Sequence, residues 1–193
     1  VARPKRWLHT EKKSAQLAGL TLAAGANLLH RRTLAAFYER IIFQQQPEQS
    51  VFSALRDLPT QPIQLSTQNL QQALLASGSI PLVLDPVNYI EGAGSGPFID
   101  GGITDYHFDW PFPTNGLVLY PHFYPSVSPG WFDKGLKWRR PKVGHYDNVV
   151  MLCPSDRWVK SLPYGKIPGR KDFNQLSDSQ RINYWQEVTE RSF

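Results

Sequence analysis

The feature that most restricts the fold of this chain is a pair of short apolar runs, at residues 117–120 and 148–153. Their apolar residues are continuous, as expected for strands that are covered on both faces. Residues 62–66 and 98–99 are further strand candidates. Together these segments predict an α/β fold.

Helices are expected before and after the strand candidate at residues 62–66. Good helix formers and spaced apolar residues over 14–43 indicate one or two helices, broken near Gly25 or Arg31. A further helix is expected directly after an N-cap at Ser66 or Thr67, and it carries Leu70, Ala73, Leu74 and Leu75.

The ends of the later helices are also marked in the sequence. Gly78 should end the helix that follows Ser66 or Thr67, and Pro81 prevents its return. A last helix is expected from an N-cap at Ser177 to about Arg191. The chain shows no internal repeat, no flexible linker and no clear domain boundary.

Positive charge is concentrated at the start of the chain. The 193 residues carry a net charge of +5, while residues 1–40 alone contain eight basic and two acidic residues. A second basic run, KGLKWRRPK, covers residues 134–142. Such clusters attract anionic lipid headgroups, so we expect peripheral contact with a membrane surface.

The cysteine content and the longest apolar stretch indicate the cellular compartment and whether the chain could span a membrane. The single cysteine, Cys153, cannot form an internal disulfide, so a reducing cytoplasm is the expected compartment. Residues 17–29 are too short and too polar to span a bilayer, and we expect a core helix there.

The sequence FIDGG places Asp100 directly before Gly101 and Gly102. Glycine lets the backbone turn freely and approach its neighbours closely. A carboxylate in this position suits a helix cap, a tight turn or a catalytic base.

Asp105, His107 and Asp109 alternate shortly after this motif. In an extended segment all three would project from one face and could bind a divalent metal, with His122 or His145 as a further ligand. Such alternation more often marks the hydrogen-bonded or solvated face of a strand, which we favour here.

Three other features have a functional and a structural interpretation. Residues 92–96, GAGSG, could bind phosphate, but no helix follows, and a tight connection is the better interpretation. Cys153 follows an apolar run, which favours a buried structural role over a nucleophile. Residues 131–142 mix tryptophans with cations, as in single-strand or lipid contacts and in ordinary solvated loops.

Two longer segments, ALLASGSIPLVLDPV at residues 73–87 and GPFIDGGITDYHFD at residues 96–109, resemble the second half of the patatin-like phospholipase domain. In that family an Ala-Ser-x-Ala/Ser-x-Pro helix end leads to a Tyr/Phe-x-Asp-Gly-Gly turn. The matching residues here are Ala76, Ser77, Ser79, Ile80, Pro81, Phe98, Asp100, Gly101 and Gly102.

The resemblance implies a three-layer α/β/α fold and a Ser-Asp dyad. The serine attacks an acyl ester and Asp100 takes its proton, while Gly101 and Gly102 support the turn. The implied substrate is a phospholipid or another acyl ester. No metal, organic cofactor or nucleic acid is expected.

The sequence departs from the family in one respect. The nucleophile should lie in Gly-x-Ser-x-Gly, and no serine of this chain has glycine two positions away on both sides. We therefore expect residues 1–193 to be the C-terminal part of the domain, with an extension from about residue 111 and an upstream segment supplying the serine. The alternative is a non-catalytic membrane- or protein-binding module with the same fold.

Overall fold

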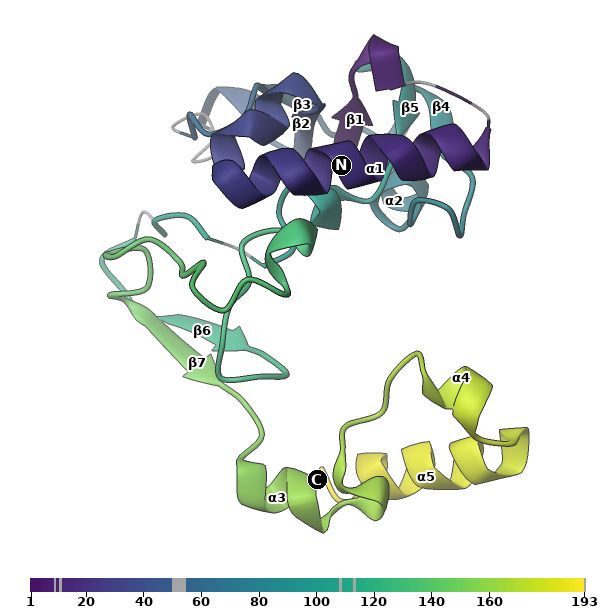
Figure 1. The fold of residues 1–193 in the computed structure, drawn as a ribbon. Helices are drawn as coiled ribbons and strands as arrows, with labels where there is room; N and C mark the ends of the chain where they lie inside the picture. Colours follow the sequence, from purple (N-terminus) through teal and green to yellow (C-terminus); the bar gives the residue numbers. More distant parts are fainter. Residues whose placement is uncertain (9, 11, 50–54, 108, 113, 193) are drawn as a thin grey trace. The chain divides into compact units, whose positions relative to one another are not determined.

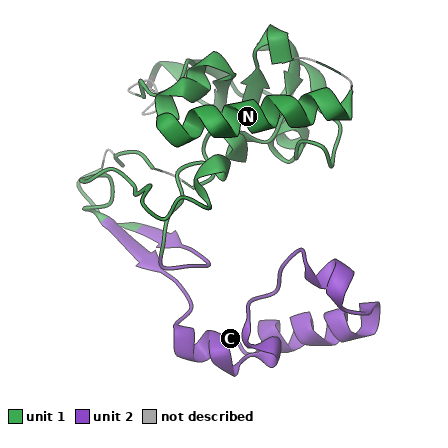
Figure 2. Ribbon diagram, in the orientation of Figure 1, with its two compact units in different colours: residues 1–118, 126–148 green, residues 119–125, 149–193 purple. Residues whose placement is uncertain are grey.

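The computed structural model describes residues 1–8, 10, 12–49, 55–107, 109–112 and 114–192 (Figure 1). It contains helices and three small sheets, which confirms the mixed α/β class. The chain divides into two compact units, where we expected no boundary (Figure 2). Unit 1 comprises Val1–Val118 and Ser126–Asn148, and unit 2 comprises Leu119–Pro125 and Val149–Phe193.

Unit 1 is built on a three-stranded sheet in the order β1-β2-β3. The strands are β1 (Ala2–Pro4), β2 (Tyr38–Gln44) and β3 (Thr60–Gln64). β2 pairs with β3 in parallel and with β1 in antiparallel orientation. The expected strand at residues 62–66 is thus confirmed, shifted two residues toward the N-terminus.

The helix expected over residues 14–43 is only partly present. α1 (Lys13–Leu29) ends at the expected break near Arg31, and a short 3-10 helix, η2 (Arg31–Ala36), follows. Residues 38–44 form β2 instead of a helix, which corrects the sequence interpretation. Ile41 and Ile42 are β-branched and favour extended backbone, and pairing with both neighbouring strands decides the outcome.

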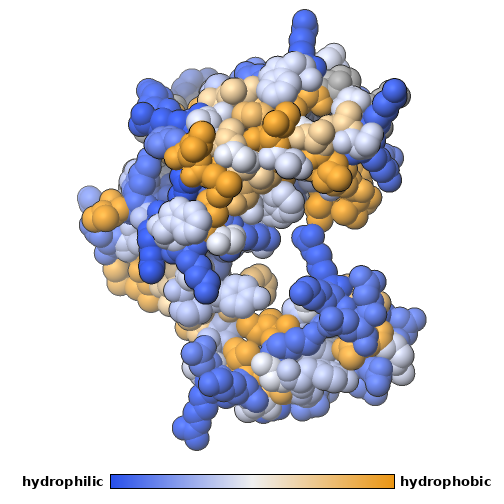
Figure 3. Space-filling view, in the orientation of Figure 1, coloured by the Kyte–Doolittle hydropathy of each residue, from blue (hydrophilic) through white to orange (hydrophobic). Residues whose placement is uncertain are grey.

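The buried residues of α1 are small, and Leu20 packs partly buried beside them. The buried residues are Gly19, Ala23 and Asn27, which recur every four positions along one helix face. The outer face leaves apolar side chains exposed, and Figure 3 shows apolar residues gathered on this side of unit 1. The exposed leucines of α1 are Leu17, Leu22, Leu28 and Leu29.

α2 (Leu70–Ser77) and a β-hairpin complete the elements near the candidate site. The hairpin pairs β4 (Val87–Ile90) with β5 (Gly94–Phe98) in antiparallel orientation. The glycine-rich segment is therefore a tight hairpin connection, as expected, and Gly92 and Gly94 adopt the positive φ that it requires.

The expected N-cap of α2 is wrong. The helix begins after Asn69, not after Ser66 or Thr67. The Asn69 side chain accepts from Ser66 N and donates to the carbonyls of Gln64 and Glu91. It therefore joins the end of β3 to the hairpin, and Gly78 ends α2 as expected.

Two buried clusters lie on opposite faces of the three-stranded sheet. Ala23 of α1 packs with Tyr38 of β2, whereas Ala76 of α2 packs with Ile41 of the same strand. Residues three apart on a strand point to opposite faces. The sheet of unit 1 therefore has α1 against one face and α2 with the hairpin against the other.

The remaining regular elements of the described chain are short helices and one further sheet. β6 (Val118–Pro121) pairs with β7 (Val149–Leu152), which confirms both predicted strands. They are not covered on both faces, because Leu119, Val150 and Leu152 are exposed. The remaining short elements are η1 (Arg6–Leu8), η3 (Pro47–Gln49), η5 (Gly101–Ile103), η6 (Trp131–Asp133) and η7 (Pro163–Gly165).

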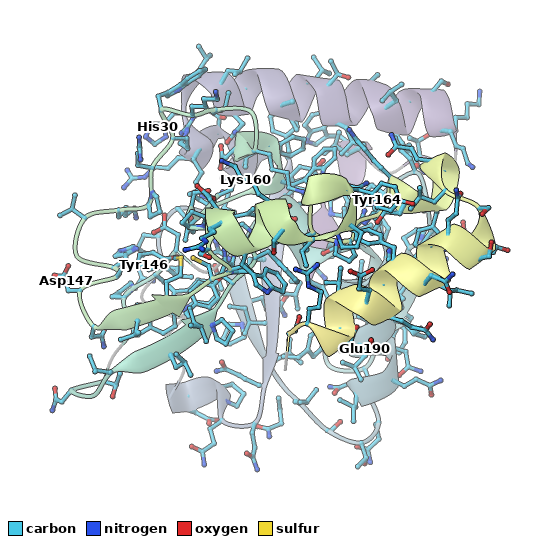
Figure 4. The ribbon with its side chains drawn as sticks, turned by 90° about the horizontal axis from the view of Figure 1, so that it is seen from below. His30, Tyr146, Asp147, Lys160, Tyr164 and Glu190 are labelled. Atoms are coloured by element: carbon cyan, nitrogen blue, oxygen red, sulfur yellow. The ribbon has the colours of Figure 1, made fainter. Side chains whose placement is uncertain are left out.

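Unit 2 contains α3 (Asp156–Ser161), α4 (Asp172–Gln175) and α5 (Asp178–Glu190). α5 has the predicted N-cap, since Ser177 and Gln180 form a reciprocal capping box. Tyr164, labelled in Figure 4, lies in η7 with its ring edge-on to Tyr184 of α5. In the part of the chain that the structure describes, none of the helices has both the length and the apolar composition of a membrane span.

A network of buried ion pairs holds unit 1 together. Arg40 of β2 donates from Nε and Nη2 to both carboxylate oxygens of Asp105, each at 2.6 Å. It also contacts Asp57, with both bonds at 3.2 Å. Arg31 contacts Asp57, Asp105 and Asp133. Burial lowers the pKa of Arg40, but the hydrogen bonds and charges of Asp105 and Asp57 outweigh it, so the pKa is raised.

Replacing Arg40 should destabilise unit 1. Arg40→Met leaves Asp57 and Asp105 facing each other in a largely buried setting, with Arg31 as their remaining cation. We expect the free energy of unfolding to fall by about 3 kcal/mol, the lower end of the effect of breaking a buried pair. Urea unfolding followed by circular dichroism measures this.

The matched control is Arg32→Met, at an exposed arginine of η2. It should change the free energy of unfolding by less than about 0.5 kcal/mol. Equal effects at positions 40 and 32 would show that the network does not stabilise unit 1.

Acid should weaken unit 2 through Asp172. Its carboxylate is fully buried, and hydrogen bonds from Lys166 and from Gly169 N lower its pKa. The stabilisation is present above the unfolded pKa of about 3.9 and is lost as the pH falls through the lower folded value. The Trp185 indole donates to Asp172 at 3.1 Å, so its NMR signal reports this loss.

Asp172→Asn should remove most of this acid dependence. Asp178→Asn is the control, because that side chain is exposed at the start of α5. An unchanged acid transition in Asp172→Asn would contradict the assignment.

Candidate active site

Asp100 lies at the junction between the hairpin and a 3-10 turn. It follows β5 by two residues and is the N-cap of η5. Its Oδ1 accepts a hydrogen bond from Gly102 N at 2.8 Å, and its own N–H donates to Ser79 O at 3.0 Å. The carboxylate therefore caps the turn that follows it, while its backbone is tied to the end of α2.

There is a direct steric reason for a glycine at position 102, two residues after Asp100. A Cβ at Gly102 would lie 3.2 Å from Asp100 Oδ1, which is tighter than an ordinary van der Waals contact. Oδ1 cannot retreat without losing its bond to Gly102 N. Gly102 thus permits the carboxylate to bond to the backbone at this short range.

The carboxylate keeps one oxygen available. Among the described residues, Oδ1 is the oxygen with a hydrogen bond, and Oδ2 has none. Asp100 is half-buried, so Oδ2 can still meet water or a substrate group. A carboxylate fixed through one oxygen and free at the other can accept a proton at a defined position.

The segment after Asp100 is fixed by the ion-pair network. Thr104 is fully buried, and its carbonyl accepts from Arg31. Asp105 is bound by Arg40 and Arg31. The Asp-Gly-Gly turn is thereby anchored at both ends, by Ser79 before it and by two arginines after it.

A pocket of about 350 Å³ lies beside the turn, lined by Gly101, Thr104, Asp105 and Ser77 among others. Ser77 is the serine of this pocket, but its hydroxyl donates to Leu74 O at 2.8 Å. Ser79 donates to Leu75 O in the same way. Neither hydroxyl is bonded to Asp100 in the part of the chain that the structure describes.

The structure does not support a metal site at the alternating residues. Asp105 binds two arginines, His107 Nδ1 accepts from Ser128 N at 2.8 Å, and Asp109 pairs with His145 at 2.9 Å. No cluster of three potential ligands forms among the described residues. Asp105, His107 and Asp109 lie outside any strand, and each binds a different partner.

The basic and aromatic run at 131–142 is partly internal. Asp133 is buried and binds Asn27 and Arg31, while Arg139 donates to Asn27 O at 2.6 Å. Lys134 lies over the Tyr106 ring at 3.6 Å. Trp131 and Trp138 remain exposed.

Cations near the start of the chain are also paired. Arg3 and Lys5 bind Glu39, and Arg31 and Arg40 belong to the buried network. Half of the eight basic residues in 1–40 therefore stabilise the fold. These pairs could not be predicted from the sequence, because the acidic partners are mostly distant in the chain.

Cys153 differs from its expected environment. It follows β7 and is half-buried, whereas we expected full burial. The alternating exposure of β7 explains this, since one side of the strand is open.

No protein-family model, curated protein or solved structure matches this chain. The site must therefore be interpreted from its own residues and geometry.

Replacing Gly102 should disturb the turn specifically. Gly102→Ala puts a methyl group against Asp100 Oδ1 and should lower the free energy of unfolding by about 1 kcal/mol, the value of a lost cap. Gly25→Ala is the matched control, because open space surrounds that position within α1. It should raise stability by about 0.5–1 kcal/mol. Chemical denaturation of both variants tests the pair, and effects of the same sign would contradict this account.

Proposed function

We propose that this chain supplies the aspartate base of a patatin-like serine acyl hydrolase. The observation that carries the proposal is the Asp100 carboxylate, held through Oδ1 by Gly102 N with Oδ2 unbonded among the described residues. Its sequence setting resembles the Asp-Gly-Gly turn of that family.

The proposed chemistry needs little from Asp100 in the ground state. A carboxylate is a weak base toward a serine hydroxyl. It assists by accepting the proton as the serine oxygen attacks the acyl carbon, and an oxyanion hole stabilises the negative charge. The ester bond then breaks, the alcohol leaves with the proton that Asp100 had taken, and water hydrolyses the acyl-serine that remains.

The serine must come from outside the described site. No serine of the sequence lies in Gly-x-Ser-x-Gly, and Ser77 and Ser79 donate to helix carbonyls. We propose that an upstream segment of the same protein supplies it. In this proposal the sheet of unit 1, with helices against both faces, belongs to a larger three-layer α/β/α domain.

The proposed substrate is a phospholipid or another acyl ester, at a cytoplasmic membrane surface. Trp131 and Trp138 are exposed, as are the basic residues Lys12, Lys13 and Arg32. Exposed tryptophans and cations would favour peripheral contact with lipid. No metal or cofactor enters the proposed reaction.

Replacing Asp100 tests the role in catalysis. In the protein that joins this chain to its serine segment, Asp100→Asn keeps the shape and removes the proton acceptor. Hydrolysis of p-nitrophenyl butyrate should fall by about 10²–10⁴-fold in kcat, the usual contribution of a general base. Circular dichroism should show an unchanged fold.

Asp147→Asn is the matched control, at an exposed aspartate of the loop before β7 (Figure 4). Its kcat should equal that of the wild type. Full activity in Asp100→Asn would remove Asp100 from the reaction and favour the non-catalytic binding module.

A further inference from the structure

A second pocket of unit 1 lies apart from the Asp-Gly-Gly turn. It has a volume of about 510 Å³, within the range of roughly 300–1,000 Å³ that small-molecule sites occupy. Its walls come from α1, from β1 and β2, from the segment 81–88 and from β5. Many of its lining residues are apolar, including Leu8, Leu20, Leu82 and Leu84.

Tyr38 gives this pocket a specific polar group. The residue is 3% exposed and lines the pocket, yet its hydroxyl has no hydrogen-bond partner among the described residues. Burial raises the pKa of Tyr38, so the hydroxyl stays protonated. The hydroxyl is not among the buried polar atoms that lack a partner, so it is open to the solvent of the pocket, and a ligand oxygen can accept a hydrogen bond from it.

The charges around the pocket restrict the ligand. None of the described lining residues is Lys or Arg, and Asp85 is an exposed carboxylate among them. An anion would have to leave water without a cation to pair with, which is strongly unfavourable. The pocket therefore fits an uncharged molecule.

The backbone of the segment 81–88 is held in an unusual shape along this wall. Leu82 has a backbone φ of 68°, a conformation that residues other than glycine and asparagine rarely adopt. Such strain is often found where a segment forms part of a binding site.

We propose that this pocket binds an uncharged amphiphile, with its chain against the leucines and a hydroxyl or carbonyl oxygen on Tyr38. The inference stands on Tyr38 and on the lining residues and does not depend on Asp100. Failure of the hydrolase assignment would therefore leave it untouched.

The test uses 1-decanol as the uncharged probe and decanoate as its anionic counterpart. Equilibrium dialysis of the 193-residue chain at pH 8 should show saturable binding of decanol and binding of decanoate at least about tenfold weaker. Tyr38→Phe should weaken decanol binding by about 3–10-fold, the value of one hydrogen bond.

Two further variants make the result specific. Tyr89→Phe removes the hydroxyl of an exposed tyrosine that is not among the residues lining this pocket, and it should bind decanol as the wild type does. Leu84→Trp fills the pocket from a half-exposed position and should abolish binding without touching the core. Circular dichroism checks that each variant is folded.

Decanoate binding as tight as decanol binding would overturn the proposal, as would equal affinity in Tyr38→Phe and the wild type. Retained binding in Leu84→Trp would place the ligand elsewhere. No saturable binding of decanol to the wild type would also refute the inference.

Discussion

The bond between Arg40 and Asp105 is the interaction on which unit 1 depends most. It joins the central strand β2 to the segment directly after the Asp-Gly-Gly turn. A buried guanidinium is tolerated because two carboxylates share its donors, and those carboxylates are held in turn by Arg31. Removing one member leaves a buried charge without its partner, which lowers the free energy of unfolding.

This network also determines how the candidate site is built. Asp100 itself is held by two hydrogen bonds. Its carboxylate accepts from Gly102 N, and its own N–H donates to Ser79 O. Those bonds define a carboxylate direction only if the turn stays in place relative to β2. The ion pairs of Asp105 and the bond from Arg31 to Thr104 O supply that constraint. The position of the Asp100 carboxylate therefore depends on the network as much as on the motif.

Local signals explain which elements the sequence could predict. Ser177 and Gln180 form a capping box within four residues, and Gly78 ends α2 beside Pro81, so both helix ends were visible in the sequence. β6 and β7 were found because their apolar runs are short and continuous. Each of these features depends on neighbours along the chain.

Long-range partners explain what was missed. β2 was expected to be helical, because its pairing with residues 60–64 cannot be seen in a window of a few residues. The charges of Arg31 and Arg40 indicated a basic surface, although their partners, at positions 57, 105 and 133, place them inside the fold. The same arginines take Asp105 away from the metal site that the alternating sequence allowed.

Residues 99 and 100 are adjacent in the chain but belong to different candidate sites of unit 1. Ile99 lines the 510 Å³ pocket and exchanges backbone hydrogen bonds with Ala2, while the next residue carries the candidate base. One segment thus contributes an apolar side chain to the pocket and, at the next residue, the candidate base. Because Asp100 is bonded to Ser79 and Gly102, its backbone is fixed on both sides at this junction.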